Sequence, residues 1–350
     1  MLDAIRAAVS DHRPITRDEA AWLWTNASDE DLAALASAVR ARFHAADHAT
    51  YLVMAIVNTT NVCVARCDYC AFYKFPGEAG TYTLTTAQIQ DRIDKLKGFG
   101  GQLVGFNGGF HPDLRVEDYC AIFQEVRRRN PDLEFYEMTV AEFMFVAKRT
   151  KLSYAAAAAA FKAAGTRWIT GGGAEVMAEA FRKRHSPAKY TVADYYDAQR
   201  AILDAGIGST ATMVIGFDET LDERLEHLEG LRAFQTSVGG RLPSFLCWTY
   251  KPWNNALGGE EVSQREYLRW LALSRIYLDN IEHVRTSVLT RNEAALEGLR
   301  YGADDFDLPT EDEVTTKAGA TISTDFARIL ASAERLGITP VKRAPFAAPA

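Results

Sequence analysis

Residues 60–73 read TNVCVARCDYCAFY and gather three of the chain's five cysteines, Cys63, Cys67 and Cys70, into one short loop. A curled loop with this spacing can turn all three thiols toward one centre, as iron–sulfur clusters require. A closed structural zinc site needs a fourth protein ligand, yet no cysteine or histidine follows the loop before His111 and Cys120. The pattern favours a 4Fe-4S cluster with one open iron over disulfides or structural cysteines. A non-catalytic electron-transfer protein and a zinc-binding module remain alternatives.

The composition narrows the class of protein. With 350 residues and 48% hydrophobic content, the chain can bury the core of one α/β barrel or of two domains, and we expect one barrel with additions. A net charge of −7 argues against a nucleic-acid partner. Apolar runs are shorter than the roughly 20 residues of a membrane span, and the start of the chain lacks a signal-peptide core. We therefore expect no membrane partner and a cytoplasmic location, where an oxygen-sensitive cluster is protected.

Strand and helix patterns alternate after the cysteine loop. The apolar run 51–57 predicts a buried parallel strand that leads directly into the loop. Further strands are predicted at 102–107, 133–138, 167–170, 208–215, 245–249 and 284–288, and helices at 85–98, 116–129, 139–148, 153–164, 174–184, 192–205, 221–235, 264–280 and 292–299. This alternation predicts an α/β fold with a partial or full parallel barrel of about six to eight units, with chemistry at the carboxyl ends of its strands.

Three parts of the chain are distinguished. Residues 1–50 are predicted to form a helical cap that begins a helix at a Thr16–Glu19 capping box, and residues 51–300 the barrel. Residues 301–350 are predicted to form a C-terminal extension that packs on the barrel, with an acidic, turn-rich stretch at 301–321, a helix at 326–336 and a mobile tail at 344–350.

Glycine-containing turns follow three of the predicted strands, at 107–112 (NGGFHP), 170–175 (TGGGAE) and 215–220 (IGFDET). Glycine permits a tight turn or the close approach of a ligand, although it also punctuates ordinary strand-to-helix connections. Because all three turns follow strands as the cysteine loop does, they predict a ligand crevice along the strand ends.

The pattern Cys-x3-Cys-x2-Cys, followed here by Ala71 and Phe72, resembles the cluster loop of the radical S-adenosylmethionine (SAM) superfamily. In that superfamily the open iron holds SAM by its amino and carboxylate groups, and one electron releases a 5′-deoxyadenosyl radical. The resemblance implies the superfamily's parallel barrel, SAM as cofactor, and a 4Fe-4S cluster on Cys63, Cys67 and Cys70.

The resemblance also implies cofactor-binding residues. Gly108 and Gly109 stand where the superfamily contacts the amino group of SAM. Glu175 is our candidate for the ribose, because a carboxylate can accept two hydroxyl hydrogen bonds, although an acid also suits the start of a helix. The predicted cofactor-binding set is completed by Tyr69, Phe72, Gly216 and Glu219.

Two further groups of residues are assigned to the substrate. His111 and Glu137 are candidate proton acceptors, although His111 precedes Pro112 and can merely close a turn. Aromatic residues at strand ends are predicted to wall the substrate cavity, although aromatic strand ends also occur in plain cores: Phe106, Phe110, Tyr136, Trp248 and Tyr250.

Five motifs resemble the menaquinone-pathway subgroup of the superfamily: CAFY (70–73), GGFHPD (108–113), GGGAE (171–175), ATMVIGFDET (211–220) and LCWTYKP (246–252). The resemblance runs from about Thr16 to Arg343, and residues 245–255 look most like the cyclic dehypoxanthinyl futalosine synthases. Aminofutalosine synthase and the tyrosine-using subunit of deazaflavin (FO) synthase are close sisters. Phe106, Phe110 and residues 135–138 and 307–309 depart from the subgroup pattern and bear on the identity of the substrate.

The subgroup resemblance implies a cyclase that acts on a nucleoside-like substrate, dehypoxanthine futalosine. Hydrogen abstraction from the 4′ carbon of its ribose, attack on its benzoate ring, and loss of an electron and a proton would form the product of the futalosine pathway. It also implies an electron donor such as flavodoxin or ferredoxin.

Overall fold

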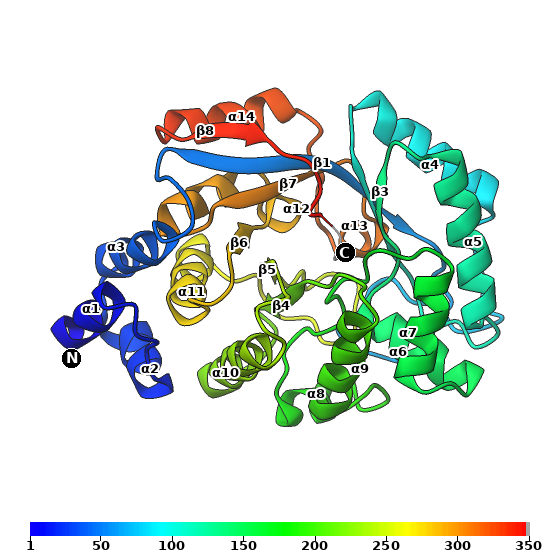
Figure 1. Ribbon diagram of the computed structural model, residues 1–350, viewed down its shortest axis with the longest axis horizontal. Helices are drawn as coiled ribbons and strands as arrows, with labels where there is room; N and C mark the ends of the chain where they lie inside the picture. Colours follow the sequence, from blue (N-terminus) through cyan, green and yellow to red (C-terminus); the bar gives the residue numbers. More distant parts are fainter. Residues whose placement is uncertain (348–350) are drawn as a thin grey trace.

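A sheet of parallel strands curves around the interior of the molecule, with helices outside it (Figure 1). The computed structural model describes residues 1–347. In this part of the chain the main path of the sheet runs β3-β2-β1-β7-β6-β5-β4, which confirms the predicted parallel α/β barrel. Its strands are β1 (His48–Asn58), β2 (Leu103–Asn107), β3 (Glu134–Tyr136), β4 (Ala211–Ile215), β5 (Ser244–Thr249), β6 (His283–Thr286) and β7 (Asp305–Pro309).

Both faces of β1 are buried, which explains its long apolar run. Val53, Ala55 and Val57 belong to the outer core beneath the helices. Leu52 and Met54 point to the other face, where they pack in the barrel interior with residues that include Leu103, Tyr136 and Trp168. Asn58 at the end of β1 pairs with Asn107 at the end of β2, so the loops after these strands begin side by side.

The sheet closes only loosely between β3 and β4. The prediction of a regular strand at 167–170 was wrong. The segment instead makes two isolated parallel bridges, Thr139 to Thr170 and Trp168 to Gly208. The main-chain nitrogen of Ile169 donates to the Gly208 oxygen at 3.0 Å. A Cβ at Gly208 would lie 2.5 Å from the Trp168 indole, so this crossing depends on a glycine.

The helices that follow β1, β3 and β4 start at side-chain caps. Thr85 with Gln88, Thr139 with Glu142, and Thr220 with Glu223 form capping boxes at three helix starts. The helices are α4 (Thr86–Gly98), α5 (Val116–Arg129), α6 (Val140–Thr150), α7 (Tyr154–Ala163), α8 (Glu179–His185), α9 (Val192–Asp204), α10 (Leu221–Ser237), α11 (Gln264–Tyr277), α12 (Val288–Arg291) and the 3₁₀ helix η1 (Asn292–Tyr301). No helix within residues 1–347 is long and apolar enough to cross a bilayer.

Two predicted helices differ from those observed. The helix predicted at 174–184 begins only at Glu179, because Gly173 and Glu175 hold positive φ angles of 85° and 44° that a helix does not allow. The segment predicted as an α-helix at 292–299 is the 3₁₀ helix η1.

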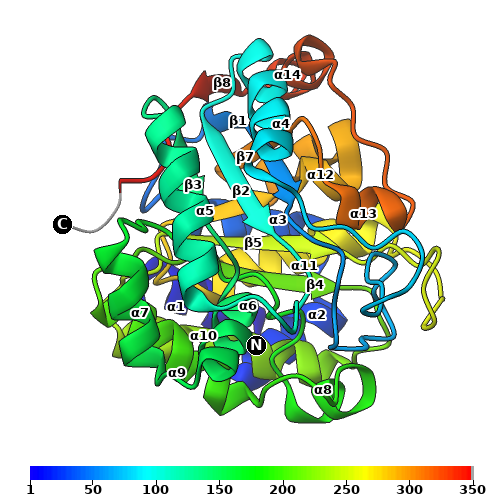
Figure 2. The ribbon, with the colours of Figure 1, turned by 90° about the vertical axis from the view of Figure 1, so that its right-hand side faces the viewer.

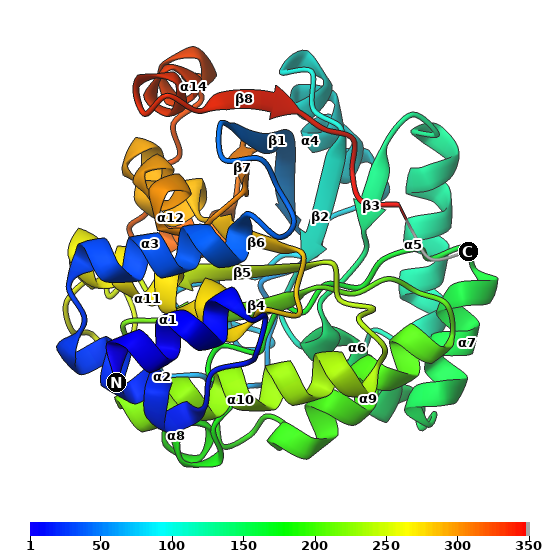
Figure 3. The same cartoon turned by 60° about the vertical axis from the view of Figure 1, so that its left-hand side comes forward.

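The N-terminal helices are α1 (Leu2–Ser10), α2 (Arg17–Asn26) and α3 (Asp29–Arg40) (Figure 3). α2 packs against α10 and α11, α3 packs against α11, and α1 packs on α3. The predicted capping box is present, since the Glu19 nitrogen donates to Thr16 Oγ1 at 3.2 Å. The Arg269 guanidinium of α11 donates to the main-chain oxygens of Trp24 and Ala27, at 2.7 and 3.0 Å. These contacts fix the N-terminal helices on the outer layer.

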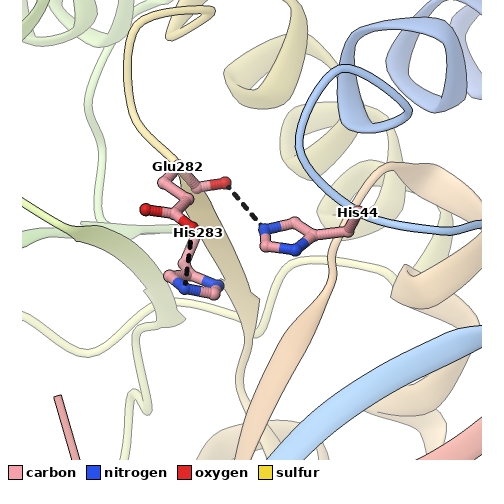
Figure 4. A group of neighbouring side chains, drawn as sticks. All are labelled: His44, Glu282 and His283. Atoms are coloured by element: carbon pink, nitrogen blue, oxygen red, sulfur yellow. Dashed lines mark hydrogen bonds and ion pairs between the residues drawn. The ribbon is translucent and has the colours of Figure 1, made fainter.

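A histidine pair ties the turn after α3 to the barrel end opposite the cysteine loop (Figure 4). The rings of His44 and His283 stack with centroids 4.6 Å apart and planes 24° apart, and each has a nitrogen near Asp304 Oδ2, at 3.2 and 2.6 Å. Glu282 lies beside them. A histidine nitrogen binds a metal in the plane of its ring, which two stacked rings cannot share. We therefore interpret this group as a hydrogen-bonded tie.

The C-terminal part enters the barrel, contrary to the turn-rich stretch predicted at 301–321. There β7 lies between β1 and β6, followed by α13 (Glu313–Lys317), α14 (Phe326–Arg335) and β8 (Thr339–Lys342), which pairs with the start of β1 (Figure 2). The Phe346 ring then packs against Trp168 and His283, with centroids 6.4 and 5.0 Å away. Of the tail predicted to be mobile, residues 348–350 lie outside the described residues.

Candidate active site

The three clustered cysteines lie together at one cavity. Cys63, Cys67 and Cys70 all line a cavity of about 360 Å³ that runs from the loop after β1 into the barrel. Cys120 on α5 and Cys247 on β5 are not among its lining residues. The structure thus brings together the three cysteines predicted as ligands.

Hydrogen bonds on both sides hold the cysteine loop. The Cys63 nitrogen donates to the Lys74 oxygen at 2.9 Å, and the Asp68 oxygen accepts from Ala256 and Leu257 in the segment after β5 (Figure 2). The Asp68 carboxylate lies 2.9 Å from Nδ1 of His185 on α8. Segments far apart in the sequence therefore fix the shape of the loop.

The thiols fit the cluster that the resemblance implies. Burial raises the pKa of Cys67 above its ordinary value and that of Cys70 to about 11. Buried thiolates therefore need a bound cation to stabilise their charge, which cluster iron supplies. A donor set of three thiols around one cavity leaves one iron of a 4Fe-4S cluster without a cysteine ligand.

The glycine turn after β2 packs directly against the cysteine loop. A Cβ at Gly109 would lie 2.2 Å from the Val62 oxygen, and one at Gly108 would lie 2.7 Å from Thr59 Oγ1. Both glycines line the cavity. The close packing alone requires glycine here, and contact with the amino group of SAM stays a prediction.

Glu175 lines the cavity opposite this turn within a network of charges. Its Oε1 accepts from Lys189 Nζ at 3.0 Å, and the same ammonium donates to the Tyr69 hydroxyl at 3.1 Å. Glu175 Oε2 is buried, lies 3.8 Å from Arg182, and has no hydrogen-bond partner among residues 1–347. An unpartnered carboxylate oxygen on a residue that lines the cavity fits the predicted ribose contact.

Most of the predicted aromatic residues face the cavity. Phe72, Phe110, Tyr136, Trp248 and Tyr250 all line it. The Phe110 ring stacks on Phe145, with centroids 4.7 Å apart, and the Tyr250 ring lies 4.6 Å from Phe217. Phe106 reaches the cavity edge, but its ring packs 5.4 Å from Phe123 of α5, so it belongs to the outer core.

The structure places four other predicted site residues outside the cavity lining. His111 Nδ1 accepts from the Asp113 nitrogen at 3.2 Å, which closes a turn. Glu137 is buried with Arg127 and Thr166. Gly216 donates its N–H to Glu219 at 2.8 Å, and Arg224 also binds Glu219, at 2.7 Å. These contacts give each of the four residues a structural role, although Glu219 Oε2 is buried without a hydrogen-bond partner within residues 1–347.

Three cavity residues were missed by sequence reasoning. Glu142 lines the cavity beside Gly108, and burial raises its pKa to about 8; its capping-box position was the available signal. No sequence signal pointed to Lys189, because it lies in a polar stretch between two helices. Arg285 on β6 is the third, and it lines the deep end of the cavity together with Asp307 on β7. Asp307 belongs to the segment 307–309, which the sequence predicted to bear on the identity of the substrate.

Comparisons with known proteins agree with this geometry. The Radical SAM superfamily matches residues 57–231, and the CofH/MqnC C-terminal region matches residues 243–346. The cyclic dehypoxanthine futalosine synthase of Streptomyces coelicolor is 35% identical over 94% of this chain and 84% of its own length. The aminodeoxyfutalosine synthase of Thermus thermophilus is 32% identical over 88% of this chain and 85% of its own. A tyrosine 4-hydroxyphenyl transferase of Methanococcoides burtonii, whose other named substrate is 5-amino-6-(D-ribitylamino)uracil, is 29% identical over 83% of each chain.

A solved structure shares the fold at low identity. Methylornithine synthase superimposes with a TM-score of 0.72 over 96% of this chain and 97% of its own, at 16% identity, which bears on the fold alone. The matches in sequence, with the three cysteines at one cavity, are what assign the chain. The protein therefore belongs to the radical SAM superfamily, in the CofH/MqnC family of the cyclic dehypoxanthine futalosine synthases and their relatives, and is an enzyme that uses a 4Fe-4S cluster and SAM.

Proposed function

We propose that this enzyme converts dehypoxanthine futalosine to cyclic dehypoxanthinyl futalosine in menaquinone biosynthesis. The observation that carries the proposal is a deep cavity with the cysteine triad at one end and aromatic and charged side chains at the other. Likeness to two cyclic dehypoxanthine futalosine synthases over nearly the whole chain, at 35% and 30% identity, supports this substrate.

The proposed reaction closes a ring by removing two hydrogens from one substrate. Held by Cys63, Cys67 and Cys70, the cluster would with SAM supply a 5′-deoxyadenosyl radical able to remove the hydrogen from the 4′ carbon of the ribose. A bond from the 4′ carbon to the benzoate ring would follow, and aromaticity would return when one electron passes to a one-electron acceptor such as the oxidised cluster and one proton passes to a base in the cavity. The chain must hold the ribose and the benzoate ring in contact and keep water out, because a mobile carbon radical would be quenched before it cyclised.

The cavity residues support these tasks. Tyr136, Trp248 and Tyr250 offer flat walls against which an aromatic ring can pack. Glu142 lines the cavity, and the burial that raises its pKa to about 8 makes its carboxylate a stronger base than that of an ordinary glutamate. We propose Glu142 as the proton acceptor in place of His111 and Glu137, because it alone of the three lines the cavity.

We also propose an electron donor for the cluster and a cellular compartment for the enzyme. We infer that flavodoxin or ferredoxin reduces the cluster, since Cys70, unlike Cys63 and Cys67, is not fully buried. The cytoplasm suits an oxygen-sensitive cluster, and the absence of a bilayer-spanning helix in residues 1–347 is consistent with this location.

An anaerobic assay with defined substrates tests the function. Reconstituted protein is incubated with dithionite, SAM and dehypoxanthine futalosine labelled with deuterium at the 4′ carbon. We expect the label in 5′-deoxyadenosine and a product that lacks the label and one ring hydrogen. Parallel reactions offer an enolpyruvyl benzoate, or tyrosine with 5-amino-6-(D-ribitylamino)uracil. Turnover of either, with the labelled futalosine untouched, would assign one of the sister activities instead.

A further inference from the structure

The deep end of the cavity holds a charged group that lies far from the cysteine loop. Arg285 on β6 is 6% exposed and Asp307 on β7 is 15% exposed, and both line the cavity. Asp307 pairs in register with Leu52 of β1. The cysteine loop starts after Asn58, six residues further along β1, which at about 3.3 Å a residue is roughly 20 Å away.

Arg285 is held firmly but is only partly satisfied. Its Nε donates to Asp305 Oδ1 at 2.6 Å, and its Nη2 binds Asp307 Oδ1. Its Nη1 has no hydrogen-bond partner within residues 1–347, and this atom is not fully buried. Because the side chain borders the cavity, one edge of the guanidinium is free to bind a ligand.

The two acids beside Arg285 differ in how well they are neutralised. Asp305 accepts from Thr50 Oγ1 at 2.5 Å and from Arg343 at 2.9 Å. Although burial opposes ionisation, Arg285 and Arg343 hold the pKa of Asp305 well below its usual range. Burial raises the pKa of Asp307 above its ordinary value in spite of Arg285. Asp305 is thus the fixed counter-ion of Arg285, whereas Asp307 is the acid whose contact with Arg285 a ligand can replace.

A carboxylate is the ligand that this arrangement suits best. A guanidinium binds a carboxylate through parallel N–H donors in one plane. A protonated Asp307 offers an O–H donor to the same group. Tyr136 also lines this part of the cavity, near enough for the charges of Arg285 and Asp307 to act on its hydroxyl.

We propose that Arg285 and Asp307 form a subsite at the deep end of the cavity that binds a carboxylate of the substrate. The inference rests on the proposed function, under which this carboxylate is that of the benzoate ring. Anchored there, the ring lies between the aromatic walls and the ribose extends toward the cysteine end. The subsite sets which atom faces the radical, and so acts by positioning.

The test compares two ligands on full-length, cluster-loaded protein with SAM. Dissociation constants are measured by anaerobic calorimetry for dehypoxanthine futalosine and for its methyl ester. We expect wild type to prefer the acid by roughly tenfold or more, the size of one charge-assisted contact, and Arg285→Gln to lose this preference while its ester affinity changes less than about threefold. Equal binding of acid and ester by wild type, or equal weakening of both in Arg285→Gln, would overturn the subsite.

Two further variants separate the subsite from folding. Asp307→Asn keeps Arg285 and is expected to retain the preference for the acid. Arg285→Gln combined with Asp307→Asn removes a matched pair of charges, so it leaves no newly unpaired acid and is expected to lose the preference. A double variant that still prefers the acid overturns the proposal, as does an Asp307→Asn variant that loses the preference.

Turnover is scored separately from binding. If wild type shows the Arg285-dependent preference but forms no cyclised product, the subsite stands and the proposed function falls. If it cyclises the substrate and binds acid and ester equally, the function stands and the subsite is overturned.

Discussion

At the scale of single residues, the cysteines at the cavity differ from the other two in what surrounds them. Cys63, Cys67 and Cys70 face one cavity, whereas Cys120 packs near the Ala160 oxygen between helices. We predict that alanine at any of the first three positions abolishes the cluster absorbance of anaerobically reconstituted protein. Cys120→Ala is the matched control and should keep its iron and sulfide. Loss of the cluster in the control, with the cluster intact in a triad variant, would refute the three-ligand assignment.

Glu175 is the second residue whose role can be tested directly. We predict that a ribose hydroxyl of SAM donates to its Oε2, which has no hydrogen-bond partner within residues 1–347, and the loss of one charge-assisted hydrogen bond costs about 1.5–3 kcal/mol. Glu175→Gln should therefore weaken SAM binding roughly tenfold or more without bleaching the cluster. Glu179→Gln is the control, because Glu179 binds the Val192 nitrogen at 2.7 Å outside the cavity. Equal SAM affinity in both variants would leave Glu175 a purely structural partner of Lys189.

The face of each strand decides which site residues the sequence could predict. The cysteine triad follows from its spacing alone. On β2, however, both faces are buried, so the pattern does not say that the Phe106 ring points to α5 while Gly105 and Asn107 border the cavity. Lys189 and Arg285 come from distant parts of the chain and reach the cavity through tertiary packing. No local periodicity in the sequence therefore predicts that they line it.

At the scale of elements, prediction succeeded where local chemistry agrees with the fold. The helices that start at Thr85, Thr139 and Thr220 follow from capping residues. The strand β7 was missed because the charged residues Asp305 and Asp307 are more typical of a turn than of a buried strand. Their partners Arg285 and Arg343 lie far away in the sequence, so a local sequence pattern does not reveal the ion pairs. Sequence patterns find elements that are stable locally and miss those that depend on buried ion pairs.

The packing of α10 on β4 makes stability depend on pH. His227 on α10 accepts from the Met177 nitrogen at 2.9 Å and binds the Thr212 main chain, and burial lowers its pKa to about 3. The unfolded chain, with a pKa of about 6.5, takes up the proton more readily. This contribution to stability is therefore complete above about pH 6.5 and is lost as the pH falls toward 3.

Comparison with a variant isolates the His227 contribution. His227→Gln should be less stable than wild type at pH 7, but the difference should narrow by about 2 kcal/mol on going to pH 5. Urea unfolding under argon, followed by circular dichroism at the two pH values, measures this difference. Parallel losses of stability in the two proteins would mean that His227 is protonated in the folded state.

At the scale of the whole molecule, the chain closes its barrel from both ends of the sequence. We propose the division into an N-terminal helical cap (1–50), a barrel (51–300) and a C-terminal extension (301–350), with one qualification. The extension supplies β7 to the sheet and Arg343 to Asp305, so the barrel is incomplete without it. On the outside of the barrel, α2 and α3 of the N-terminal cap pack against α10 and α11.

The end of the extension lies beneath the deep end of the cavity. The Phe346 ring packs on Trp168, which belongs to the same interior cluster as Leu52 and Tyr136, and the Arg343 guanidinium lies 4.1 Å from the Phe346 ring centroid. Because the Phe346 ring packs against this interior cluster, we infer that it excludes water from the subsite of Arg285 and Asp307.

Removing this ring should uncouple radical formation from product formation. Phe346→Ala is expected to cost about 1–2 kcal/mol, since the ring is half-buried, and to let water reach the substrate radical. The ratio of 5′-deoxyadenosine to cyclised product, measured anaerobically, should rise above that of wild type. Val341→Ala is the control, because Val341 on β8 is 42% exposed. If Phe346→Ala lowered the melting temperature but kept the wild-type ratio, the extension would act only as an anchor for β7, and exclusion of water would have to come from substrate binding itself.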